Sequence, residues 1–236
     1  MHRILLLPAM FLTVAAVPVR GADAKDQKDN TPPEGFTALF NGKDLTNWKG
    51  LIELPQRTKL SPEELAKAHK EADKKLFHWK VEDGVIHFDG KGENLQTAKD
   101  YGNFELYVDW KIKERGDSGI YLRGNPQVQI WDSDHLADNL KDDWHTGSGG
   151  LWNNQHHPKK PLLKADKPVG QWNTFHIIMK GDKVTVILND KKVVDNTPLE
   201  NFWEKGKPLP SKGPIELQNH GDELWFKNIY IKELPD

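Results

Sequence analysis

The chain contains no cysteine among its 236 residues. No disulfide can therefore stabilise the fold, and a chain of this length can bury a core large enough to fold without one. A lipid anchor on cysteine is excluded for the same reason.

The sequence also lacks an excess of positive charge. It carries 33 Lys and Arg against 35 Asp and Glu, for a formal net charge of −2. Proteins that bind nucleic acid usually present a basic stripe or patch, and the sequence contains neither that nor an RNA- or DNA-binding motif. We therefore expect no nucleic-acid partner.

Short catalytic and metal-binding motifs are missing as well. There is no H-E-x-x-H, no Cys-x-x-Cys and no G-x-S-x-G. The acidic run Asp132–Asp143 lacks the glycine and the terminal glutamate of an EF-hand loop. Local motifs therefore do not identify a metal site or a nucleophile.

The N-terminus has the composition of an export signal. Residues 1–24 combine a basic start, an apolar run from Ile4 to Val19 and a small-x-small site at Ala22–Ala24. This pattern is typical of a cleaved secretory signal peptide, and the run is short for a membrane anchor. We expect a periplasmic or secreted protein that is free of the membrane after cleavage, with residues 25–34 as a flexible lead-in.

Short runs of β-forming residues, separated by turn residues, fill most of the chain. They predict an all-β fold, a sandwich or jelly roll, as a single domain over residues 35–236. The 9 Trp and 9 Phe supply material for its core. The predicted strands cover residues 36–40, 79–82, 84–88, 94–97, 103–114, 118–123, 127–132, 173–180, 183–189, 192–194, 213–219 and 223–233.

One segment interrupts this β pattern. Ser61 is a suitable N-cap, Pro62 suits the first helical position, and Glu64 completes a capping box. These residues predict a charged helix over 62–75, which we interpret as a surface insertion covering about 61–76. The stretch 133–171 has no periodicity, and a loop of that length is usually functional or disordered.

Four predicted strands carry one apolar face and one face with an unusual polar content. Side chains alternate between the two faces of a strand, so residues of the same parity lie together. A solvated face would favour Lys, Glu and Thr, whereas aromatic plates with amide and guanidinium groups suit a sugar ring. If the strands are neighbours, this face is a carbohydrate cleft formed by Glu105, Tyr107, Asp109, Tyr121, Arg123, Gln127, Gln129, Trp131, Glu216, Gln218 and His220.

Six stretches together resemble the 3-keto-disaccharide hydrolase family. They are GFTALFNGKDLTNW, WKVEDGVI, NFELYVDWKI, SGIYLRG, VQIWD and GPIELQNHGDELWFKNIYIKEL, and they extend from about Gly35 to Leu234. The resemblance implies a concanavalin A-like jelly roll. It also implies action on sugars oxidised to a ketone at C3, by hydrolysis or by a lyase reaction, often with a divalent metal.

A ketone at C3 acidifies the C2 proton, so a base can remove it and β-elimination can expel the C1 oxygen. Such a reaction needs a general base, a group that stabilises the enolate and an acid for the leaving group. A divalent metal, calcium or a transition metal, would assist it as a Lewis acid; no organic cofactor is expected. Our candidates are His220, Glu105 and His145 for catalysis, Tyr107, Arg123, Gln127, Gln129, Trp131, Trp152 and Gln218 for the substrate, and Asp132 and Glu216 for the metal.

Two other functions fit the same cleft. A conventional retaining glycosidase needs two carboxylates roughly 5–5.5 Å apart. Glu105 and Asp109 share a face, but four residues along a strand separate them by about 13 Å, so Glu105 would need a partner from a neighbouring strand. A non-catalytic sugar-binding module would use the same aromatic and amide groups without converging acids and a histidine. A structural adhesion domain has no positive support in the sequence.

Overall fold

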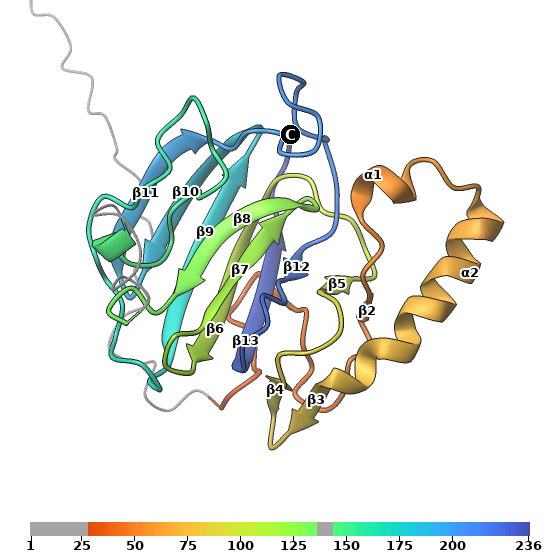
Figure 1. The fold of residues 1–236 in the computed structure, drawn as a ribbon, viewed down its shortest axis with the longest axis horizontal. Helices are drawn as coiled ribbons and strands as arrows, with labels where there is room; N and C mark the ends of the chain where they lie inside the picture. Colours follow the sequence, from red (N-terminus) through yellow and green to blue (C-terminus); the bar gives the residue numbers. More distant parts are fainter. Residues whose placement is uncertain (1–27, 136–143) are drawn as a thin grey trace, which may run out of the picture.

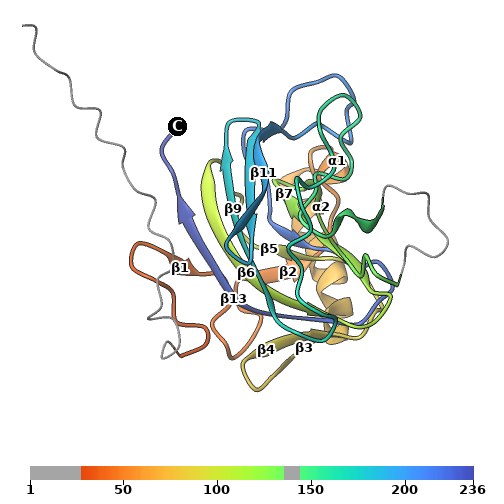
Figure 2. The same cartoon turned by 90° about the vertical axis from the view of Figure 1, so that its left-hand side faces the viewer.

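A computed structural model describes residues 28–135 and 144–236, and it places them in two antiparallel sheets packed face to face (Figure 1). The predicted signal peptide, residues 1–24, lies outside the described residues. In Figure 1, β7 and β8 lie in front of β6, β9 and β10, and Figure 2 shows the two layers from the side. The predicted concanavalin A-like jelly roll is confirmed.

The larger sheet has eight strands in the order β11-β10-β9-β6-β13-β4-β3, with β1 paired to β13. The smaller sheet has five strands in the order β2-β5-β12-β7-β8. The strands of the larger sheet are β1 (Thr37–Ala38), β3 (Trp79–Glu82), β4 (Val85–Phe88), β6 (Phe104–Ile112), β9 (Asn173–Lys180), β10 (Lys183–Leu188), β11 (Lys191–Pro198) and β13 (Leu224–Glu233). Those of the smaller sheet are β2 (Trp48–Gly50), β5 (Leu95–Thr97), β7 (Asp117–Leu122), β8 (Asn125–Trp131) and β12 (Glu216–Leu217).

The core lies between the sheets and follows from the alternation of side chains along each strand. Leu106 and Val108 of β6 point inward from one sheet, while Ile120 and Val128 point inward from the other, and all four are fully buried. Phe88 adds an aromatic stack, with its ring 4.0 Å from that of Trp79. The apolar faces expected from the sequence therefore meet as predicted.

The observed strands differ from the expected ones mainly in length. β11 is longer than the predicted 192–194, and β12 is shorter than the predicted 213–219. The edge strand β2 and the short helix α1 (Leu54–Arg57) were not expected, since neither has a periodic apolar pattern.

The predicted insertion helix is present as α2 (Pro62–Ala72), followed by the 3-10 helix η2 (Asp73–His78). The Ser61 side chain accepts a hydrogen bond from the Glu64 backbone N–H, and the Glu64 carboxylate accepts one from Ser61, as in a capping box. The insertion lies beside β2 and β5 (Figure 1). A Cβ on Gly50 would come within 2.5 Å of the Ala72 backbone, so glycine allows this close packing.

The described part of the long loop comprises residues 133–135 and 144–171; its second segment begins with the 3-10 helix η4 (Trp144–Thr146) and then extends the smaller sheet. Gly149 donates its N–H to Gln129, and Gln129 donates its own to the Gly150 carbonyl. Gly149 has a φ of +96°, and a Cβ there would come within 2.6 Å of Val193. Glycine at position 149 therefore lets the loop pair with β8 while it lies close to Val193 of β11.

Among residues 28–135 and 144–236, no helix is long and apolar enough to cross a membrane.

Removing a large side chain from this core should destabilise the protein strongly. We expect Phe226→Ala to lower the free energy of unfolding by about 3–5 kcal/mol, because a fully buried ring leaves a cavity. Phe77→Ala is the matched control, since that ring is 66% exposed. Urea titrations followed by fluorescence measure both, and equal effects of the two substitutions would contradict this account of the core.

Candidate active site

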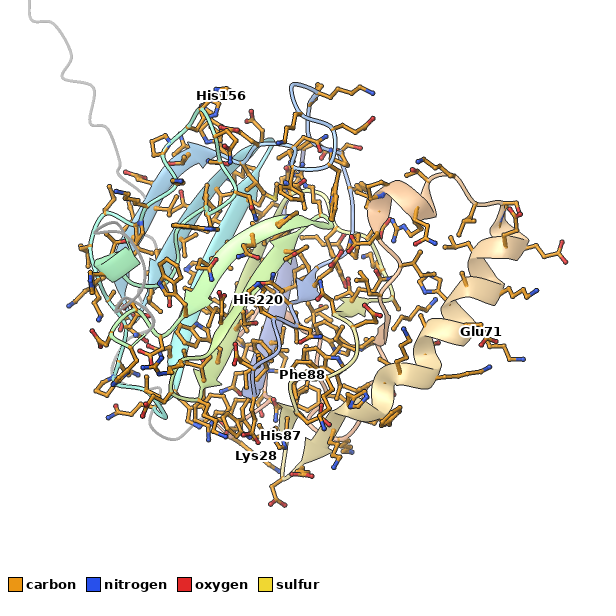
Figure 3. All side chains as sticks on the ribbon, viewed as in Figure 1. Lys28, Glu71, His87, Phe88, His156 and His220 are labelled. Carbon is orange, nitrogen blue, oxygen red and sulfur yellow. The ribbon has the colours of Figure 1, made fainter. Side chains whose placement is uncertain are left out.

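A cavity of about 320 Å³ opens on the outer face of the smaller sheet. The face opposite the core carries the alternate residues of β7, β8 and the segment after β12. The cavity is lined by Asp117, Tyr121, Pro126, Gln127, Gln129, Trp152, Asn153, Phe202, Gln218 and His220. Figure 3 shows His220 beside β7 and β12, near the middle of that view.

A chain of polar contacts crosses the cavity floor from β8 to His220. Gln127 donates a hydrogen bond from Nε2 to Oε1 of Gln129. Gln129 donates from its own Nε2 to Oδ1 of Asp117, at 2.6 Å. The other carboxylate oxygen of Asp117 lies 3.4 Å from Nδ1 of His220. The structure thus links three predicted residues, Gln127, Gln129 and His220, in one chain of contacts through the carboxylate of Asp117.

Asp117 is the residue that the sequence analysis missed. Burial raises the pKa of its carboxyl group, and the nearby His220 acts in the opposite direction. It precedes Gly119 and Tyr121 on the same face of β7, so alternation alone could have identified it. Tyr121 was expected on this face but was given no role.

Trp152 lines one wall of the cavity, and Trp131 packs behind it. The rings of Trp131 and Trp152 lie 5.0 Å apart at an angle of 57°. Trp131 is buried and donates its indole N–H to the Gly147 carbonyl, whereas Trp152 lines the cavity. Trp131 therefore supports the position of Trp152, and Trp152 offers the stacking surface.

Buried side-chain oxygens without a hydrogen-bond partner gather on this face. Oε1 of Gln127 and Oε1 of Gln218 both lack one within the described part of the chain. Each would lie 3.1 Å from a Cβ built on Gly119. Because a buried acceptor without a donor costs free energy, the pair suits a ligand that brings hydroxyl groups.

Glu216 lies deeper on the same face, toward the insertion. It is fully buried, and one of its carboxyl oxygens accepts a hydrogen bond from Asn94. Burial raises its pKa from 4.5 to about 8, so the group is mostly protonated at neutral pH. The other oxygen, Oε1, would lie 3.4 Å from a Cβ on Gly124, where Leu54 of α1 also packs.

Tyr121 connects this deep carboxyl group to the cavity. Its hydroxyl accepts a hydrogen bond from Nε2 of Gln218. Burial raises the pKa of Tyr121, and the nearby Glu216 and Glu53 raise it further. The phenol is protonated at neutral pH and can donate a hydrogen bond to an oxygen in the cavity.

Glu105 and Tyr107 do not lie at this cavity, so their predicted place in the cleft is wrong. They point outward from β6, which belongs to the larger sheet. Glu105 lies 3.0 Å from Nε2 of His176, and the ring of Tyr107 stacks on the same imidazole at 4.2 Å. Alternation gave the correct face of the strand, but strand sequence does not say which sheet the strand joins.

Arg123 was also expected in this cleft, and it lies elsewhere. It follows the end of β7 with a φ of +55°, after a register shift between Ile120 and Leu122. Its guanidinium donates hydrogen bonds to the Gly102 carbonyl and to Asn103. The change of backbone direction ends the alternation one residue before Arg123.

The predicted metal ligands do not form one site. Asp132 accepts backbone N–H groups from Arg115, Asp134 and His135, so its oxygens already hold the start of the loop. Asp132 follows β8 and lies next to Asp117, at the start of β7. Glu216 pairs with Tyr121, four residues further along β7, so the two predicted ligands are about 13 Å apart along the sheet. Within the described ranges, no three His, Cys, Asp or Glu side chains gather to hold an ion. These two residues do not fit a shared metal centre.

His145 is exposed in η4 and is not among the residues that line the cavity. The position of Gln218 is compatible with its predicted role, because Gln218 lines the cavity together with His220. Asn153 and Phe202 come from loops distant in sequence, and no local pattern marked them.

The cavity does not supply the paired carboxylates of a retaining glycosidase. That reaction needs two acids roughly 5–5.5 Å apart, and Asp117 is the one carboxylate among the described residues that line it. An imidazole next to a carboxylate, with a phenol and amides around it, instead suits removal of a proton next to a carbonyl group.

Filling the floor of the cavity should weaken ligand binding with little effect on folding. A Cβ on Gly119 would lie 3.0 Å from Cδ of Gln127, so Gly119→Ala pushes the amides into the cavity. We expect sugar affinity to fall about tenfold, as for the loss of one good polar contact. Gly102→Ala is the control, because its nearest neighbours are at 3.4–3.5 Å. Calorimetric titration that finds equal affinities for the two variants would refute the assignment.

Glu216→Gln should change how stability depends on pH. A carboxyl group whose folded pKa is raised stabilises the protein at low pH, and that contribution is lost as pH rises from 4.5 to about 8. We expect the variant to gain on wild type over this window by roughly 2 to 4 kcal/mol. Urea titrations at pH 5 and pH 8 test this, with Glu34→Gln at an exposed carboxylate as control. A pH-independent difference would show that burial does not hold Glu216 neutral.

Comparisons with known proteins agree with this fold. A curated 3-keto-disaccharide hydrolase of Bacteroides thetaiotaomicron is 27% identical over 253 residues, covering 85% of this chain and 79% of its own. A crystal structure from Parabacteroides distasonis, provisionally assigned as a glycosyl hydrolase, is 27% identical with a TM-score of 0.67 and covers 88% of this chain and 100% of its own. A second from that organism, 24% identical with a TM-score of 0.61, covers 91% and 97% and shares the fold. The profile of the 3-keto-alpha-glucoside-1,2-lyase-like domain matches residues 35–232, and the chain belongs to that family.

Proposed function

We propose that this protein is an exported carbohydrate-active enzyme that cleaves the glycosidic bond of 3-keto-glycosides. The family and the name of the Bacteroides relative support a sugar substrate. The observation that carries the proposal is the pair of His220 and Asp117, 3.4 Å apart, at a cavity lined by amides and Trp152.

His220 is the general base in this proposal. Asp117 lies next to Nδ1, so it favours the tautomer in which Nδ1 carries the proton and Nε2 is free to accept one. Gln129 holds Asp117 by a hydrogen bond to its other oxygen. His220 is 57% exposed at its side chain and can therefore meet a substrate that enters from solvent.

The reaction begins when His220 removes the proton from C2, which the C3 ketone has made acidic. The electron pair left on C2 forms an enolate, and its collapse breaks the bond from C1 to the glycosidic oxygen. The proton held by His220 is then available for the departing oxygen. Addition of water across the new C1–C2 double bond completes a net hydrolysis.

Tyr121 stabilises the charge that develops on the C3 oxygen. The phenol is protonated at neutral pH and lines the cavity, so it can donate a hydrogen bond where the negative charge forms. Gln127 and Gln218 offer unpaired amide oxygens to sugar hydroxyls, and Trp152 offers an aromatic face to the ring.

Assays with paired substrates test the proposal. We expect wild type to cleave a 3-keto-glucoside and to leave the matching unoxidised glucoside intact. His220→Ala should lower kcat by about 10²–10⁴-fold, the usual contribution of a general base. Asp117→Asn should lower kcat less and should shift the pH profile, because it changes the preferred tautomer.

His87→Ala is the matched control, since His87 pairs with Glu223 at 2.8 Å on the larger sheet. Wild-type activity in His220→Ala, or cleavage of the unoxidised sugar alone, would overturn the proposal. Loss of cleavage after treatment with EDTA, restored by added calcium or manganese, would establish the predicted divalent ion separately.

A further inference from the structure

A buried amide outside the cavity connects the loop that carries His220 to the groups beneath the cavity. Asn94 directly precedes β5, is 8% exposed and is not among the residues that line the cavity. Its Oδ1 accepts the backbone N–H of Asn219 at 2.9 Å, and Asn219 precedes His220 in the chain. Its Nδ2 donates a hydrogen bond to Glu216 at 3.1 Å.

The same side chain acts on the phenol of Tyr121. Burial raises the pKa of Tyr121, and hydrogen bonding by Gln218 and Asn94 acts in the opposite direction. Glu216, to which Asn94 donates, is the cross-strand neighbour of Tyr121. Because an amide has one acceptor oxygen and two donor hydrogens, Asn94 can contact the His220 loop, Glu216 and the phenol at the same time.

The imidazole of His220 has little side-chain contact to hold it. It is 57% exposed, and its Nδ1 lies 3.4 Å from Asp117, slightly farther than in a usual hydrogen bond. The place of the ring therefore depends mainly on the backbone that carries it. We call residues 219–222 the base loop.

Hydrogen bonds fix the base loop on two sides. Asn219 donates from Nδ2 to the Gly92 carbonyl at 2.8 Å, and its Oδ1 accepts the Gly221 N–H at 2.7 Å. On the other side, Asp222 accepts the backbone N–H of Asp117 at 3.0 Å. The base loop is thereby joined to β7 and to the segment before β5.

That segment, residues 89–94, is itself anchored by β3 and by the insertion. The Trp79 indole N–H donates to the Glu93 carbonyl at 2.9 Å. Nζ of Lys75, in η2, lies 2.9 Å from the Glu93 carboxylate. Asn94 therefore holds the base loop from a segment that is fixed on its far side.

We propose, resting on the proposed function, that Asn94 and Asn219 are positioning residues for His220. They hold its imidazole at a fixed place relative to the phenol of Tyr121. In the proposed reaction the base must meet the C2 proton while the phenol meets the oxygen on the adjacent carbon, so the spacing of the two groups must match the sugar. A misplacement of about 1 Å can lower a rate by about 10²-fold.

Steady-state kinetics with a 3-keto-glucoside tests the inference. Asn94→Ala removes the acceptor of the Asn219 N–H, and Asn219→Ala removes two solvent-exposed bonds of the base loop. We expect kcat to fall roughly 10–100-fold in each variant while KM changes less than about threefold, because the groups that bind the sugar are unchanged. Wild-type kcat in both variants would overturn the inference.

The same substitutions in the His220→Ala background separate positioning from a general structural role. A residue that acts through the base has nothing left to position there, so we expect each substitution to change the residual kcat by less than about twofold. A further loss as large as in wild type would show that the two amides support the fold in general, and it would refute the inference.

Asn173→Ala and Asn41→Ala are the matched controls, and both should keep wild-type kcat. Asn173 is buried, and its Oδ1 accepts the Lys167 backbone N–H at 2.8 Å. Asn41 is exposed and accepts the backbone N–H groups of Lys43 and Asp44. Neither lines the cavity.

NMR of the imidazole reads the position of His220 without turnover. Its signals are assigned by their loss in His220→Ala. We expect them to move toward the values of free histidine in Asn94→Ala and Asn219→Ala and to stay unchanged in the two controls. If wild type does not cleave the 3-keto-glucoside, the proposed reaction fails, and these signals decide the inference alone: signals that match wild type in both test variants contradict it. If Asn94→Ala does not fold, Asn219→Ala decides by the same measurements.

Discussion

The smaller sheet is buried on both faces, because its inner face packs in the core and its outer face is covered by loops and by the insertion. The properties of the site depend on this burial. Polar groups on that face are removed from water, so each one needs a partner from the protein or from a ligand. Gln129 and Asp117 find partners in the chain, whereas Gln127 and Gln218 keep one oxygen each without one. A sugar has the hydroxyl donors that would satisfy these oxygens.

The same burial sets the chemistry of the ionisable groups. Removal from water disfavours charge, so Glu216 holds its proton at neutral pH, and the pKa of Tyr121 moves further above its usual range. Asp117 lies next to His220, which opposes the effect of burial on its pKa. The site thus combines a neutral hydrogen-bond donor and a base oriented by a carboxylate within one sheet face.

Loops complete the site because side chains inside the fold anchor them. Gly124, Asn125 and Pro126 form more than a turn, since Asn125 donates its amide to the Glu200 carbonyl and accepts the Phe202 N–H. Asn154 likewise bonds the carbonyls of Pro158 and Pro198. These buried amides connect segments 75 and 44 residues apart, so the loops beside the cavity are tied to the core.

Much of the fold could be predicted from local patterns. The alternation of Ile120 and Val128 with Tyr121 and Gln127 identified which side chains enter the core, because strand geometry alone determines it. The capping box of Ser61 and Glu64 located the start of α2 for an equally local reason. The same rule placed Gln127, Gln129, Gln218 and His220 on a polar face, and they do line one cavity.

The sequence by itself therefore determined which face of its strand each side chain occupies. It also determined that one of those faces carries the aromatic and amide groups that suit a sugar ring. Only the tertiary structure decided which strands share a sheet. Glu105 has the correct parity but lies on the far side of the sandwich, and Asp117 has the same parity and meets His220. Strand pairing depends on contacts between residues distant in sequence, so local pattern cannot specify it, and the active site depends on that pairing.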